Sequence, residues 1–162
     1  MITRMHAPTL YLDTSVIGGY FDDEWKDATQ ELWRLRDAGQ FHFQTSIIAF
    51  DEITQAPDEV RELFHRTFAD PANLLMVTEE MEELAEAYLA ASVVSSKYTD
   101  DARHVAVVAV SRLDFLVSWN FKHLVNVQRE AGFNAVNLLQ GYPPVRIINP
   151  LQLIYGNTTE SV

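Results

Sequence analysis

Four polar residues stand where an α/β protein could carry out chemistry. Asp13 and Asn120 each come just after a short, β-prone apolar run, and Asp101 opens a segment rich in Ala and Val. Glu52 lies roughly two helical turns after a Thr-Ser pair that can cap a helix. Ligands of parallel α/β folds gather beyond the carboxyl ends of the strands, so these four side chains are candidates for one site.

Carboxylates that meet in one cleft favour a bound divalent cation. Like charges raise one another's pKa, and a hard cation removes that repulsion. Mg²⁺ and Mn²⁺ prefer oxygen ligands and keep several waters. Such an ion can supply a water nucleophile and stabilise charge on a phosphoryl group. Asp13, Glu52 and Asp101 are therefore the candidate ligands of a catalytic Mg²⁺ or Mn²⁺ ion.

Each of these residues also has a purely structural explanation. Asp13 and Asn120 could cap the helices that follow them. Asp101 could complement the dipole of its helix from the first turn. Glu52 could be an exposed helix residue, and Asp51 beside it is equally acidic. The placement of all four near predicted strand ends favours a common site.

The elements that would position these residues alternate between strands and helices. Strands are expected at 9–12, 41–44, 74–77, 115–118 and 145–148. Helices are expected at 27–38, 47–54, 58–68, after Thr78, at 101–113, and from 121 to about 131, where Gly132 would close the helix. This alternation predicts an α/β sandwich with a central, mostly parallel sheet of four to five strands.

Length and composition fit one domain. The 162 residues hold no linker or repeat, so residues 1–155 are expected to form a single domain and 156–162 a frayed tail. Without cysteine, a metal must rest on oxygen or imidazole ligands, which suits a reducing cytoplasm. No signal peptide and no stretch long enough for a membrane helix is apparent, so we expect a cytoplasmic protein that does not enter a membrane.

The formal net charge of −11 argues against a nucleic-acid binder of the basic-patch kind. The charge is unevenly placed, because eleven acids lie between residues 51 and 86 and only Arg61 and Arg66 oppose them. Such a segment can be a solvated helix surface or a dock for a basic partner. Both explanations stay open.

Four segments resemble, in order, the motifs of PIN domains. They are residues 12–17, 46–53, 101–106 and 116–124, followed by a closing strand and turn at 148–150. The second motif places its acid on Glu52 rather than Asp51. The motifs span almost the whole chain, and the resemblance implies a PIN-like three-layer sandwich.

The resemblance also implies an activity and partners. PIN domains of this kind are Mg²⁺- or Mn²⁺-dependent endoribonucleases, often the toxin of a bacterial toxin–antitoxin pair of the VapC type. Asp13 and Asp101 would then bind the metal, with Glu52 as a further ligand that holds or deprotonates the attacking water. Such toxins usually form homodimers and bind an antitoxin protein. Many PIN domains carry a fourth Asp where this chain has Asn120, which would assist in the metal's outer shell without adding charge.

Substrate contacts follow from the same resemblance. Thr14 and Ser15 would position a water or a phosphate oxygen near the metal. Arg103 and Lys122 are the nearest basic candidates for contacts to RNA phosphates, together with His123. His104 is expected to be a partly buried structural histidine one turn after Asp101.

Two other functions would use some of the same residues. A phosphatase of the haloacid-dehalogenase type also begins with an Asp at a strand end, but it needs a second Asp two residues later, where this chain has Ser15. A catalytically weak or inactive PIN-like binding module is the second, favoured by Asn120 and by the acidic segment 51–86.

Overall fold

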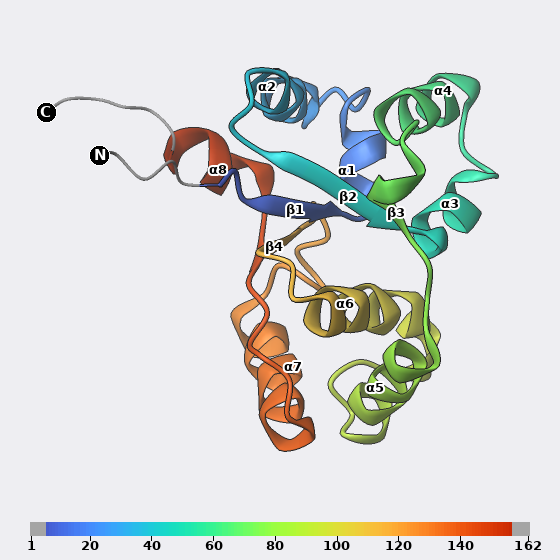
Figure 1. Ribbon diagram of the computed structural model, residues 1–162, viewed down its shortest axis with the longest axis vertical. Coiled ribbons are helices and arrows are strands. Elements are labelled where there is room, and N and C mark those ends of the chain that lie inside the picture. Colours follow the sequence, from blue (N-terminus) through green and yellow to red (C-terminus); the bar gives the residue numbers. More distant parts are fainter. Residues whose placement is uncertain (1–5, 157–162) are drawn as a thin grey trace, which may run out of the picture.

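Helices cover both faces of a five-stranded sheet in the computed structural model, which describes residues 6–156 (Figure 1). All strand pairs are parallel. From one edge to the other, the strands are β3 (Leu74–Leu75), β2 (His42–Ser46), β1 (Thr9–Leu12), β4 (Phe115–Val117) and β5 (Ile147–Ile148). The predicted three-layer α/β sandwich is confirmed.

The helices form the two outer layers. One face is covered by α1 (Thr14–Gly19), α2 (Lys26–Asp37), α3 (Ile47–Ile53), α4 (Asp58–Thr67) and α8 (Pro150–Gly156). The other is covered by α5 (Glu79–Ala90), α6 (Thr99–Ser111) and α7 (Val127–Gln140). Two short 3₁₀ turns, η1 (Pro71–Asn73) and η2 (Ser96–Tyr98), precede β3 and α6.

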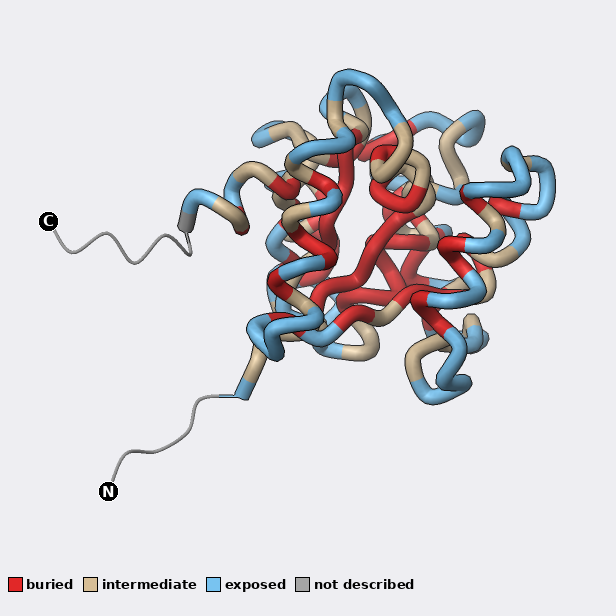
Figure 2. Tube along the Cα trace, turned by 90° about the horizontal axis from the view of Figure 1, so that it is seen from above, coloured by how far each residue is buried: buried red, intermediate tan, exposed pale blue. Residues whose placement is uncertain are grey.

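The central strands are apolar on both sides because each face of the sheet packs against helices. In β1, Leu10 and Leu12 point to the α1–α4 side, whereas Tyr11 points to the α5–α7 side. All three side chains are fully buried. Figure 2 shows the resulting buried interior beneath exposed outer turns. A strand buried on both faces cannot show the polar–apolar alternation of a surface strand.

The strand register brings the carboxyl ends of β1, β2 and β4 to the same edge of the sheet. Leu12 pairs with Val117, and the Asp13 backbone N–H donates to the Val117 carbonyl at 3.2 Å. On the other side of β1, the Thr45 hydroxyl donates to the Leu12 carbonyl at 2.7 Å. The residues that follow these strands therefore begin from adjacent points.

The helix predicted from Phe121 to about Ala131 was wrong. The side chain of Asn126 accepts from the backbone N–H groups of the second and third residues after it, so the helix begins at Val127. It continues through Gly132, where an added Cβ would lie only 3.0 Å from Val93, and it ends at Gly141, whose φ is +84°. Gly132 is thus a packing residue, and Gly141 is the helix stop.

Two further predictions concern the edges of the fold. The predicted strand at 74–77 is shorter, because only Leu74 and Leu75 pair with β2 and Met76 is 66% exposed. The frayed tail predicted at 156–162 lies outside the described residues from 157 onward; Gly156 is the last residue of α8. Within residues 6–156, no helix is both long enough and apolar enough to cross a membrane.

Candidate active site

Asp13 is held at the end of β1 by a set of hydrogen bonds. Its carboxylate accepts from the Ser15 hydroxyl at 2.6 Å, from the Ser118 hydroxyl at 2.5 Å and from the Val16 backbone N–H at 3.3 Å. The last bond caps α1, so the structural and the functional interpretations of Asp13 are compatible. Burial raises the pKa of Asp13, although nearby His104 and these hydrogen bonds oppose the rise.

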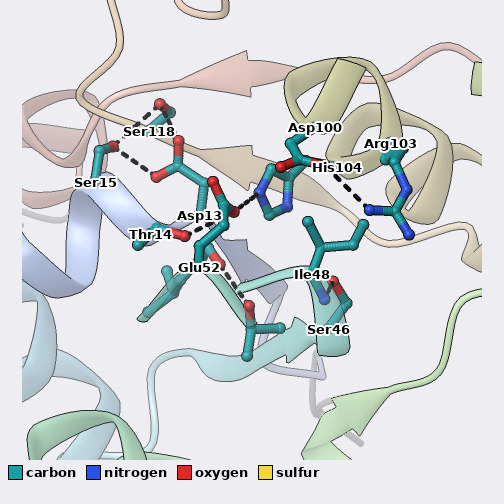
Figure 3. A network of polar contacts seen from close by, with 12 residues as sticks. Asp13, Thr14, Ser15, Ser46, Ile48, Glu52, Asp100, Arg103, His104 and Ser118 are labelled. Carbon is teal, nitrogen blue, oxygen red and sulfur yellow. Dashed lines mark hydrogen bonds and ion pairs between the residues drawn. The ribbon is translucent and has the colours of Figure 1, made fainter. Parts of the chain in front are cut away.

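Glu52 lies on α3, and its carboxylate points back over the strand ends (Figure 3). One oxygen accepts from the Thr14 hydroxyl at 2.9 Å and contacts His104 Nε2 at 2.7 Å. Ser46, the last residue of β2, caps α3 by accepting from the Ile48 N–H. That cap sets where the helix begins and hence where Glu52 falls. Burial raises the pKa of Glu52, but the hydrogen bond from His104 and the charge of His104 outweigh burial. The pKa of Glu52 therefore lies below its ordinary value, which favours the carboxylate anion.

His104 is buried between Glu52 and Tyr11. It is 1% exposed, and its Nδ1 lies 2.5 Å from the Tyr11 hydroxyl, which is 2.6 Å from the Ser46 hydroxyl. If both ring nitrogens carry protons, His104 donates to Glu52 and to Tyr11, and Tyr11 donates to Ser46, so each of these three protons has an acceptor. Burial lowers the pKa of His104, but the bond to Glu52 and the charges of Asp13 and Asp101 raise it above its ordinary value.

Asp101 lines a cleft together with Glu52. It lies in the first turn of α6, and an open cavity of about 290 Å³ is lined by it, Glu52 and the segment from Lys97 to Asp100. Burial raises the pKa of Asp101 to about 6; the charge of His104 opposes the rise, and those of Asp13 and Glu52 add to it. Within residues 6–156, no hydrogen bond to the Asp101 carboxylate is formed. This carboxylate is the member of the group that is both exposed to the cleft and free of a donor.

The other predicted residues have different surroundings. Asn120 follows β4 and accepts from the His123 backbone N–H at 3.0 Å, so its side-chain oxygen caps a turn. Arg103 forms its ion pairs with Glu82 at 2.8 Å and with Asp100 at 3.0 Å, and with none of Asp13, Glu52 and Asp101. Lys122 is exposed.

The hydroxyls predicted beside the acids are in place. Thr14 donates to Glu52, and Ser15 donates to Asp13. The Ser15 oxygen also accepts the Trp119 backbone N–H at 2.9 Å, which ties the start of α1 to the segment after β4. Both residues therefore position the carboxylates.

The donor set fits a hard divalent cation in its chemistry. Asp13, Glu52 and Asp101 come from three different segments, and the charges of the first two raise the pKa of the third. Carboxylate oxygens are the ligands that Mg²⁺ and Mn²⁺ prefer. Among the residues that the structure describes, no three or more acidic or imidazole side chains are arranged so that together they could hold a metal ion. Mg²⁺ usually takes one or two carboxylates and fills its other positions with waters, so a closed cage is not required.

Sequence reasoning missed the chain from Glu52 through His104 and Tyr11 to Ser46. The four residues come from α3, α6, β1 and β2, and their mutual distances depend on how these elements pack. The only sequence signal was the position of His104 one turn after Asp101, which places both on one face of α6. Ser118 was counted in a strand, and its role as a donor to Asp13 was also missed.

Comparison with solved structures supports the fold. The crystal structure of FitAcB from Neisseria gonorrhoeae matches with a TM-score of 0.54 and 14% identity, over 88% of this chain and 98% of that chain. VapBC2 from Rickettsia felis, solved bound to a DNA fragment from the promoter of its components, matches with a TM-score of 0.53 and 11% identity, over 87% and 98%. The chain has a PIN-like fold. No protein-family model and no curated protein matches the sequence.

Within the PIN-like fold, the carboxyl edge of the sheet carries the acids. Asp13 follows β1, Glu52 lies on α3 directly after β2, and Asp101 lies in the first turn of α6. At 11–14% identity the comparison establishes architecture, and the chemistry has to be argued from the residues themselves.

Proposed function

We propose that this protein is a metal-dependent endoribonuclease that hydrolyses RNA phosphodiester bonds, of the kind that acts as the VapC-type toxin of a toxin–antitoxin pair. The observation that carries the proposal is the set of acids at the carboxyl edge of a PIN-like sheet: Glu52 is bonded to His104, and the charges of Asp13 and Asp101 act on the same histidine. Since its substrate would be cellular RNA, the enzyme would act in the cytoplasm.

Asp13 and Asp101 would hold a Mg²⁺ or Mn²⁺ ion, with Glu52 as a third ligand or as the residue nearest the attacking water. When bound, the ion would stabilise negative charge on the phosphoryl group and lower the pKa of a water. Glu52, an anion in this setting, would accept the proton of that water. The water oxygen would form the new bond to phosphorus as the bond to the leaving ribose oxygen breaks. Thr14 would keep the Glu52 carboxylate aimed at the cleft.

Cleavage of a labelled single-stranded RNA with Mn²⁺, Mg²⁺ or EDTA tests this function. We expect cleavage that depends on the metal and falls roughly 100-fold or more in Asp13→Asn and Asp101→Asn, the size expected when a group that stabilises transition-state charge is lost. Asp51→Asn is the matched control: it removes an exposed carboxylate next to Glu52 and should leave the rate unchanged. Equal rates in wild type and both site variants would refute the mechanism.

An antitoxin partner and a homodimer belong to the same proposal. Eleven acids between residues 51 and 86 would favour a partner whose binding segment is basic, since opposite charges steer association. One structural neighbour, VapBC2, is named for two components and was solved bound to a DNA fragment from their promoter. Size-exclusion chromatography with light scattering, alone and with a candidate antitoxin, measures both assemblies.

A binding module without catalysis is the second candidate. The Asn120 side-chain oxygen caps a turn, so the fourth polar position of the site serves the local fold. Mn²⁺ titration separates the two functions, because an ion that binds only the folded state raises the melting temperature as its concentration increases. A nuclease should be stabilised by Mn²⁺, and Asp101→Asn should abolish that stabilisation. A binding module should show neither effect.

A further inference from the structure

Three basic side chains without an acidic partner lie around His123, and one of them, Lys97, lines the acidic cleft. Lys97 precedes α6, Lys122 follows β4, and Arg129 lies in the first turn of α7. In the part of the chain that the structure describes, no carboxylate lies within 4.0 Å of their charged nitrogens, whereas five other basic side chains are paired in this way. Among the described residues, Arg66, Arg112 and Arg146 have no such partner either, so the feature that distinguishes Lys97, Lys122 and Arg129 is their common position around His123.

A stack of two aromatic rings, Tyr98 and His123, brings the neighbouring residues Lys97 and Lys122 to the same region. The rings of Tyr98 and His123 lie 3.7 Å apart between centroids with an interplanar angle of 30°. Tyr98 ends η2, just before α6, and His123 belongs to the turn that Asn120 caps. The stack therefore joins the segment that leads into Asp101 to the segment after β4.

The positions of the three charges are consistent with this arrangement. The Lys97 ammonium lies 6.0 Å from the centre of the Tyr98 ring, and the Arg129 guanidinium donates to the Val93 carbonyl. Burial lowers the pKa of His123, and the charges of Lys122, Arg129 and Lys97 lower it further. His123 is thus kept neutral among three cations and is suited to stacking. Arg129 is held by its carbonyl partner, while Lys97 and Lys122 are exposed.

This basic rim borders the acids. Lys97 and Tyr98 line the same cleft as Glu52 and Asp101. An RNA strand that brings one phosphate to the carboxylates must place its neighbouring phosphates a few ångströms away, where bare acids would repel them. Lysines at the rim would offset that repulsion and set the register of the strand.

We propose that Lys97 and Lys122, held together by the Tyr98–His123 stack, bind the backbone phosphates of single-stranded RNA next to the phosphate that is cleaved. The proposal rests on the proposed ribonuclease function and adds a substrate-binding subsite to it. Lys122 was a candidate phosphate contact from the sequence; Lys97 and the stack that pairs the two lysines emerge from the structure. Tyr98 and His123 act as positioning residues.

Fluorescence anisotropy with a labelled single-stranded RNA, measured in EDTA to prevent cleavage, tests the subsite. Lys97→Gln/Lys122→Gln should weaken binding by about 10-fold at low salt, and the slope of log affinity against log salt should fall by about 1.4, since each phosphate contact in a single strand contributes about 0.7. The matched control is Arg112→Gln/Arg146→Gln. It removes the same charge from two exposed residues at the amino-terminal ends of the strands, where Arg112 precedes β4 and Arg146 precedes β5. This control should change the affinity less than about 2-fold.

The stack is tested by two variants at one position. Tyr98→Phe keeps an aromatic ring and should bind RNA like wild type, whereas Tyr98→Ala should lose part of the affinity and of the salt dependence. Equal weakening in the lysine and control variants, or an unchanged salt slope in the lysine variant, would overturn the subsite. If wild type cleaves RNA with Mn²⁺ but the lysine variant matches the control, only the subsite fails. If wild type neither binds nor cleaves RNA, the subsite and the ribonuclease function both fail.

Discussion

Replacing Asp101 by Asn is expected to stabilise the protein while it removes the proposed activity. Burial raises the pKa of Asp101 from 3.8 to about 6, and the charges of Asp13 and Glu52 add to the rise. At neutral pH the folded protein therefore holds an ionised carboxylate in a place that disfavours it. Asparagine keeps nearly the same shape without the charge.

The magnitude follows from the size of the pKa rise. Each pKa unit corresponds to about 1.4 kcal/mol, so a rise of about two units sets an upper bound near 3 kcal/mol. Solvent in the open cleft screens the charge, and the carboxylate also complements the dipole of α6 from its first turn. We therefore expect a net gain of about 1 kcal/mol at pH 7.5, or roughly 2–4 °C in melting temperature for a chain of this length.

The pH dependence identifies the cause. The folded pKa lies above the unfolded one, so the penalty is absent below pH 3.8, grows between 3.8 and about 6, and is full above that. The gain of Asp101→Asn should therefore be present at pH 7.5 and vanish near pH 4. Thermal melts of both proteins in EDTA at the two pH values measure it.

Asp100→Asn is the control for this prediction. Asp100 is the neighbouring acid in the same turn of α6, and it forms an ion pair with Arg103. Its substitution should give no gain. A loss of stability in Asp101→Asn at pH 7.5, or an equal gain at pH 4, would show that charge repulsion in the cleft is not the cause.

The remaining predictions concern stability. His104→Gln should lower the free energy of unfolding by about 2 kcal/mol, because it leaves Glu52 without its buried partner. The loss should be largest between pH 4.5 and 6.5, where the raised pKa of His104 and the lowered pKa of Glu52 make the ion pair complete. Urea titrations at several pH values measure it. Gly19→Ala should destabilise the protein by about 1–3 kcal/mol, because the added Cβ would lie 2.7 Å from the Trp119 indole. Gly18→Ala should stabilise it slightly, because no atom lies within 4 Å of the added Cβ. The same melting temperature in both variants would contradict this packing.

Local patterns predicted most elements because the relevant forces act between near neighbours. Asp13, Ser46 and Thr78 cap the helices that follow them, and each cap is a bond within three residues. The start of α7 was missed for a physical reason of the same kind. Asn126 accepts two backbone N–H groups, but nothing in the sequence ranks this cap above a helix beginning at Phe121.

The two glycines of α7 show where local reasoning ends. Gly132 and Gly141 are alike in a sequence, and both can close a helix. Gly132 lies against Val93, which approaches from the end of α5, while Gly141 adopts a positive φ. Only the packing of α5 on α7 distinguishes the helix interior from its end.

For the site, the sequence alone determined which residues carry charge and whether they stand after a strand or in a helix: Asp13, Glu52, Asp101 and the neutral Asn120. The parallel order of the strands then required the acids to meet at one edge. Tertiary structure alone decided that His104 pairs with Glu52 across 52 positions of sequence and lies within range of the charges of Asp13 and Asp101. Distances between side chains on different elements depend on the packing of whole helices against the sheet, and no pattern within a single segment contains them.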